Sequence, residues 1–149
     1  MATLTTAPGL LSMLRQKMHD PSESVLREYH RILEGKPRDY PIGAADERHA
    51  RQLVDRHLYE LISKASRDSE WPRLHFIAAG EFEEAARIAT LAEHLPEEIR
   101  ELHLEAGKQY RKASVKFQES IKTDDLSFLF VSIQTLGFAL DHLEACLRI

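Results

Sequence analysis

The chain has 149 residues, of which 43% are hydrophobic and 30% are charged, and its formal net charge is −4 with neutral histidines. This apolar share is that of an ordinary globular domain, so the composition excludes a wholly disordered chain. The slight acidic balance gives no general attraction to nucleic acid or to an acidic membrane surface. No linker, charge block or low-complexity tract divides the sequence, so we expect a single α-helical domain over residues 1–149.

Cysteine content and hydropathy indicate the compartment. Cys146 is the single cysteine of the sequence, so no internal disulfide can form, which fits a reducing compartment. The N-terminal segment lacks the early basic residues of a signal peptide, and no apolar run reaches the ~18 residues that a membrane span requires. We therefore expect a cytoplasmic protein with no membrane partner and with a loose tail at residues 1–7.

Two helices are predicted before residue 35. The first is short, and its apolar side consists of Leu10, Leu11, Leu14 and Met18. A second helix is expected to begin at Pro21, because proline suits the first turn of a helix and Asp20 can cap it. Gly35 ends this helix as a C-terminal cap, and residues 35–43, with two prolines and two glycines, form a loop.

Three helices are predicted in the middle of the chain. Residues 44–66 form a long amphipathic helix. Pro72 fits the first turn of a short helix, which Gly80 is expected to break, so that residues 81–94 form a separate alanine-rich helix. A break of this length predicts that these two helices form an antiparallel hairpin.

The helix that begins at Pro96 carries glutamates in its front half and a basic stripe in its back half. The stripe consists of Lys108, Arg111, Lys112 and Lys116. Such a stripe can bind an anionic partner, for example a phosphate backbone. However, the helix dipole favours the same charge order in any solvated helix, and no aromatic residues are interleaved for stacking on bases. We therefore favour a solvated face, and nucleic acid is the less favoured partner.

Residues 126–149 are the most apolar and most regular segment of the chain. Read as a helix, they form a seam at alternating spacings of three and four: Leu126, Leu129, Ile133, Leu136, Leu140, Leu143 and Leu147. A second apolar row, which includes His142, lies beside this seam. A helix with two apolar rows must be covered on two sides, so we expect it at the centre of a bundle or in a subunit interface. The seam is then either intramolecular core, which we favour, or the surface of a homodimer.

Histidine and glutamate residues offer a candidate metal site. Metal sites on helices place histidine and carboxylate side chains about one turn apart. The best set in this sequence joins His57 and Glu60 to His142 and Glu144 of the last helix. The alternative is that each histidine is hydrogen-bonded at the edge of the core. We favour this alternative and expect no cofactor.

No catalytic motif accompanies these features. The sequence contains no Gly-x-Ser-x-Gly, no phosphate-binding glycine loop and no nucleotide fingerprint. The patterns together predict an all-α, bundle-like, compact domain of six or seven helices with the helix 126–149 at its centre. We expect a non-enzymatic protein–protein interaction or regulatory module that acts through a helical surface or as a homo-oligomer. A metal- or ligand-binding bundle is the alternative, and a binder of an anionic partner is the further alternative.

Overall fold

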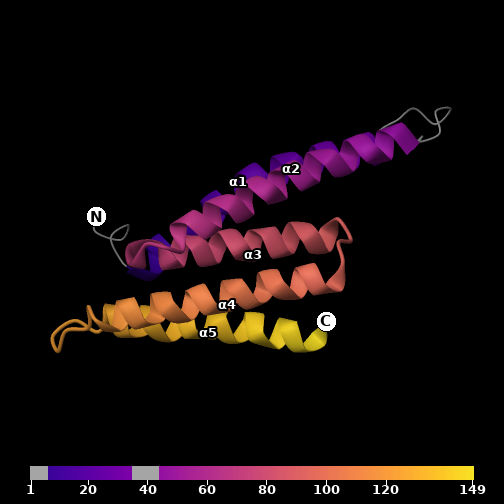
Figure 1. Ribbon diagram of the computed structural model, residues 1–149. Coiled ribbons are helices and arrows are strands. Elements are labelled where there is room, and N and C mark those ends of the chain that lie inside the picture. Colours follow the sequence, from indigo (N-terminus) through magenta and orange to yellow (C-terminus); the bar gives the residue numbers. More distant parts are fainter. Residues whose placement is uncertain (1–6, 35–43) are drawn as a thin grey trace.

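The computed structural model describes residues 7–34 and 44–149, which form a bundle of five α-helices (Figure 1). The prediction of an all-α fold is confirmed, since no strand occurs in these ranges, whereas the prediction of six or seven helices is wrong. A 3-10 turn, Pro72–Leu74, precedes the third helix. The helices are α1 (Ala7–Glu34), α2 (Ala44–Asp68), α3 (His75–Leu91), α4 (Pro96–Gln118) and α5 (Ser127–Arg148).

The helix at the centre of the bundle is α3. It contacts the antiparallel hairpin of α1 and α2 on one side and α4 on the other, while α5 packs mainly on the far side of α4 (Figure 1). The prediction that the C-terminal helix is central is therefore wrong. Its sequence shows two apolar rows, but neighbouring helices cover only one of them.

Pro21 lies inside α1 and does not begin a second helix. A proline in a helix interior removes one backbone hydrogen bond and costs about 3 kcal/mol. Leu11, before the proline, and Leu26, after it, are both buried against other helices. We infer that burying apolar side chains on both sides of Pro21 offsets the cost and keeps α1 continuous.

Gly80 does not break the chain either, because α3 continues through it. A Cβ atom at this position would lie 2.5 Å from Sδ of Met18 in α1. The glycine therefore permits the close approach of two helices. The antiparallel hairpin predicted around Gly80 is wrong, and the chain reverses instead between α3 and α4. There Glu93 has a φ of 56° and the amide of His94 donates to the carbonyl of Ala89, as in a Schellman motif.

Two apolar clusters make up the core. The α2-side cluster includes Leu26, Val54, Leu58, Phe82 and Leu102. The α5-side cluster includes Leu11, Phe76, Tyr110, Val131 and Ala139. Helices α1, α3 and α4 contribute to both clusters, whereas α2 contributes to the first and α5 to the second.

Two of the predicted segments fall outside the described residues. These are the loop at residues 35–43 and the loose tail at residues 1–7, apart from Ala7, where α1 begins. Within the part of the chain that the structure describes, no helix combines the length and the hydropathy that a membrane crossing requires.

Candidate functional site

The two apolar rows of α5 have opposite environments. The inner row, represented by Val131, Thr135 and His142, is buried against α4 and its neighbours. The predicted seam is the outer row, and Leu140 is 61% exposed. The seam is therefore not part of the core of the single chain, contrary to the alternative that we favoured. Its exposed members are Leu126, Ile133, Leu136, Leu140, Leu143 and Leu147, joined by Phe130, while Leu129 is half-buried.

Gly137 lies on this outer face of α5. Apart from its two chain neighbours and the backbone of its own helix, a Cβ atom at Gly137 would have no atom of the described residues within 4 Å. The absence of a side chain is therefore not explained by packing within the chain. Because Gly137 has no side chain, the helix backbone is uncovered between the exposed side chains of Ile133 and Leu140. The backbone of another molecule can approach closely there.

The basic stripe of α4 is exposed. Together with His75 and Val115, its four residues line a depression of 410 Å³. Lys108 pairs with Glu105 at 3.2 Å and Lys116 with Glu119 at 3.1 Å. Nearby glutamates thus pair with two of the four cationic side chains of the stripe. The stripe consists of Lys108, Arg111, Lys112 and Lys116.

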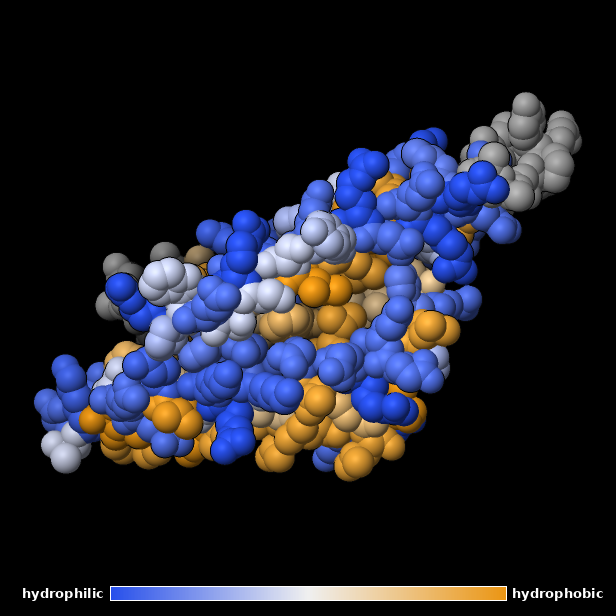
Figure 2. Space-filling model, viewed as in Figure 1, coloured by the Kyte–Doolittle hydropathy of each residue, from blue (hydrophilic) through white to orange (hydrophobic). Residues whose placement is uncertain are grey.

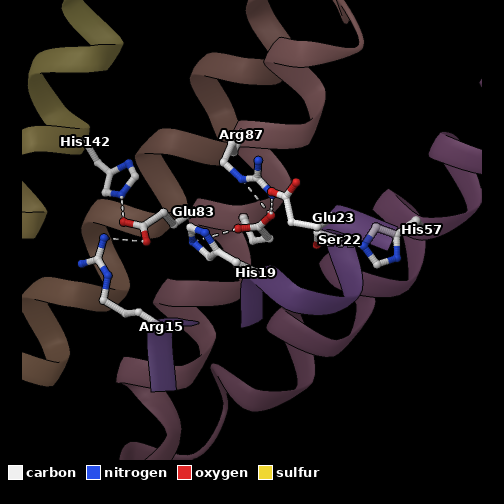
Figure 3. Close-up of polar contacts among 9 residues, drawn as sticks. Arg15, His19, Ser22, Glu23, His57, Glu83, Arg87 and His142 are labelled. Atoms are coloured by element: carbon white, nitrogen blue, oxygen red, sulfur yellow. Dashed lines mark hydrogen bonds and ion pairs between the residues drawn. The ribbon is translucent and has the colours of Figure 1, made fainter. Parts of the chain in front are cut away.

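The four predicted metal-binding residues enter separate contacts. His57 of α2 shares a 3.0 Å hydrogen bond with Ser22 of α1, and burial lowers the pKa of its imidazole. Glu144 pairs with Arg148 on the surface of α5, and Glu60 is exposed on α2. The fourth residue, His142 of α5, contacts Glu83 of α3 and lies away from His57 (Figure 3). Within residues 7–34 and 44–149, no three His, Cys, Asp or Glu side chains are grouped so that they could hold a metal ion.

Glu83 of α3 joins three helices through its carboxylate (Figure 3). One oxygen pairs with the guanidinium of Arg15 in α1 at 2.9 Å, and the other contacts Nε2 of His142 in α5 at 2.8 Å. Nδ1 of His142 lies 2.8 Å from Nδ1 of His103, so one of these two nitrogens must donate and the other accept. Burial and the neighbouring His142 lower the pKa of His103. The Tyr110 ring stacks on the imidazole of His142 and fixes its plane.

Glu84, the next residue, makes a parallel set of contacts. Its carboxylate is fully buried, pairs with the guanidinium of Arg87 and lies 3.0 Å from Nε2 of His19 in α1. Arg87 also reaches Glu23 of α1 at 2.8 Å. These ion pairs fix the position of α1 on α3, which is a structural role (Figure 3). His142 was among the predicted site residues, whereas its partners Glu83 and His103 were not predicted.

Glu81 lies on another side of α3, facing α2. It is 2% exposed, and neither carboxylate oxygen has a hydrogen-bond partner among the described residues. The ammonium of Lys64 is 4.0 Å away. Burial, together with the carboxyl group of Asp68, raises the pKa of Glu81 to about 8. The folded environment of Glu81 therefore favours the protonated form of its carboxyl group.

A groove of 720 Å³ runs between α2 and α4, with α3 beneath it. Figure 2 shows it as a hollow with a hydrophobic floor between two hydrophilic ridges. Hydrophobic side chains also gather along the edge where α5 lies (Figure 2). The molecule thus presents two separate apolar surfaces to solvent.

Comparison of the chain with models of protein families, with curated proteins and with solved structures gives no match. The candidate functional features are the outer face of α5, the groove between α2 and α4 and the basic stripe of α4.

Proposed function

We propose that the chain is a non-enzymatic protein–protein interaction module that forms a homodimer through the outer face of α5. The observation that carries this proposal is the exposed row that contains Ile133, Leu140 and Leu147, the last of which is 89% exposed. The row follows a helix of 22 residues, which is about 33 Å long. Contiguous exposed apolar surface of this extent is typical of interaction sites on soluble proteins.

The spacing of the row supports self-association. Alternating steps of three and four residues are the pattern by which one helix packs along another. The same surface on two copies is self-complementary across a twofold axis. The charged residues of α5, Asp141, Glu144 and Arg148, all lie in its last turns. An antiparallel pair would place the two acidic ends apart, so we favour that orientation.

Gly137 supports the same proposal, because it lies between two exposed side chains of the row, Ile133 and Leu140. Small residues on a helix face permit two helix backbones to approach closely. Nothing in the described part of this chain occupies the space above Gly137. A partner helix that crosses α5 at Gly137 would bury Ile133 and Leu140 on either side of the crossing point.

The test compares two equally exposed leucines. Leu140 is 61% exposed on the outer face of α5, and Leu95 is 62% exposed at the start of α4. Leu140→Glu is expected to convert a dimer into a folded monomer, and Leu95→Glu to leave the dimer intact. Native mass spectrometry and light scattering give the subunit count, and circular dichroism reports whether the variants remain helical.

Three results would contradict the proposal. The unmodified chain could remain monomeric at high micromolar concentration. Leu95→Glu could dissociate the dimer as fully as Leu140→Glu does. Finally, Leu140→Glu could unfold the chain, which would mean that its side chain belongs to the core.

An anionic partner of the basic stripe is the second candidate. The depression lined by His75, Arg111 and Lys112 supports it, because several cationic groups face one small region. Binding of a labelled single-stranded nucleic acid should then be strongest at low salt and should weaken when Arg111 and Lys112 are both replaced by glutamine. Absence of binding at low ionic strength would eliminate this candidate.

A further inference from the structure

We propose that the groove between α2 and α4 binds a basic amphipathic helix of another protein. Its floor is apolar and is contributed by three helices. The floor residues are Leu58, Ile62, Phe82, Ala89 and Leu102. Its volume of 720 Å³ is enough to take several large side chains of a ligand.

The length of the groove suits a short helix. Along α2 its lining extends from Asp55 to Ser66, which is about 16 Å at 1.5 Å per residue. This length corresponds to about three helical turns. A helix laid there would contact α2 on one side, α4 on the other and α3 beneath, and would present its apolar face to the floor.

The charge of the rim specifies a basic partner. Glu98, Glu101 and Glu105 line the groove from α4, at spacings of three and four residues, and Asp55 lines it from α2. No lysine or arginine is among its described lining residues. Within the chain Glu98 contacts His94, and Glu105 pairs with Lys108, which lies outside the lining. A partner helix with lysine or arginine at i and i+4 would therefore place cations near Glu101 and Glu105.

His94 closes one end of the groove. Its Nε2 atom lies 3.1 Å from Asp55 of α2 and its Nδ1 atom 3.1 Å from Glu98 of α4. The contacts tie the two walls together at that end, so we expect the partner to occupy the part of the groove beside Glu101 and Glu105.

Two surfaces of a second copy are poorer occupants. The outer face of α5 has the required apolar row, but Asp141 and Glu144 flank it and would face the acidic rim. The basic stripe of α4 has the required charge but is exposed mainly through lysine and arginine side chains. Apolar and basic character are thus found on different elements of the described chain, which favours a partner from another protein.

The experiment measures fluorescence anisotropy of two labelled peptides with the full chain. Both peptides are helices of about 14 residues, chosen to cover three to four turns, with the same leucine face. One carries lysine and the other glutamate at the flanking positions. We expect the basic peptide to bind at least tenfold more tightly, and its affinity to fall as salt screens the rim.

Matched variants of α4 locate the binding. Glu101→Gln with Glu105→Gln removes two charges from the rim and is expected to weaken the basic peptide about fivefold, since an exposed ion pair contributes up to about 1 kcal/mol. Glu97→Gln with Glu119→Gln removes two exposed charges at the ends of α4 that do not line the groove, and should leave the affinity unchanged.

The proposal is overturned if the basic peptide fails to bind at low salt, or if both peptides bind equally. It is also overturned if the control variant, Glu97→Gln with Glu119→Gln, weakens binding as much as the rim variant, Glu101→Gln with Glu105→Gln. A third contradiction would come from self-association. If the variant Glu101→Gln with Glu105→Gln changes the number of subunits, a second copy of this chain occupies the groove.

Discussion

Helices α3 and α5 distribute polarity in opposite ways. The inner helix, α3, buries Glu81 and Glu84 at 2% and 0% exposure, whereas the outer helix, α5, leaves Leu140 at 61% and Leu147 at 89%. Both helices are largely apolar by composition. The difference teaches that the apolar residues of this chain exceed what its own core can bury, while its interior retains carboxyl groups.

The two regions also differ in what they can contribute to stability. Buried ion pairs contribute little net stability, but breaking one leaves a charge without a partner and is costly. The contacts of Glu83 and Glu84 therefore specify where α1 and α5 dock on α3. Exposed leucines, in contrast, contribute little to folding. The favourable free energy of burying their apolar surface is obtained only when a partner covers them.

The largest expected effect is a dependence of the free energy of unfolding on pH, caused by the buried Glu81 of α3. Glu81 has a folded-state pKa of about 8, against 4.5 as its ordinary value, so folding favours the protonated form. Its contribution is fully present below pH 4.5 and is lost as the pH rises through 8, a loss of about 3–5 kcal/mol. Glu81→Gln should abolish this loss. Urea titrations at pH 5, 7 and 9 measure it, and parallel pH profiles for the two chains would refute the assignment.

Glu83→Ala is the next largest perturbation. It removes the acceptor of Arg15 and His142, and we expect a destabilisation of about 2 kcal/mol, moderated because Arg15 reaches water. Glu144→Ala is the matched control, because it breaks an exposed pair with Arg148 and should change the free energy of unfolding by less than about 0.5 kcal/mol. Equal losses in chemical denaturation would mean that the network contributes no more than a surface pair.

A smaller effect on stability distinguishes Gly80 of α3 from Gly137 of α5. Gly137→Ala should stabilise the monomer by about 0.5–1 kcal/mol, because alanine is the better helix former and its Cβ meets open space. Gly80→Ala should gain less, since Met18 must move to make room. Thermal unfolding at low protein concentration measures both. A larger gain at Gly80 would contradict the packing described here.

The smallest expected effect concerns the outer face of α5. In the monomer, Leu140→Gln should change the free energy of unfolding by less than about 0.5 kcal/mol, because the side chain is already in water. The same change at Leu102, which is 8% exposed, should cost about 2 kcal/mol or more. If both variants lose equal stability at nanomolar concentration, α5 has no free outer face.

Helix positions were largely predictable from the sequence, whereas helix connections were not. The predicted helix 44–66 corresponds to α2 and Pro96 begins α4, because periodicity and proline placement are local signals. Pro21 and Gly80 were misread as breaks. Whether a proline is tolerated, or a glycine serves a close contact, depends on the helix packed against it, which local signals do not contain.

The candidate site was predictable in part, and for the same reason. The outer row of α5 follows from spacing alone, but spacing cannot tell which of two apolar rows a neighbour covers. The groove depends on α2 and α4 standing apart above α3, a tertiary property. The predicted grouping of His57 with His142 required α2 and α5 to be adjacent, and α3 and α4 lie between them.

The division of the core into an α2-side and an α5-side cluster bears on how the molecule opens. Because α2 and α5 each contact one cluster while α1, α3 and α4 cross both, the outermost helices can detach separately, each as a cooperative unit. Native-state hydrogen exchange should then reveal two partial openings of different free energy, with the slowest amides in α3. If α5 pairs with a second copy, its opening alone will depend on protein concentration.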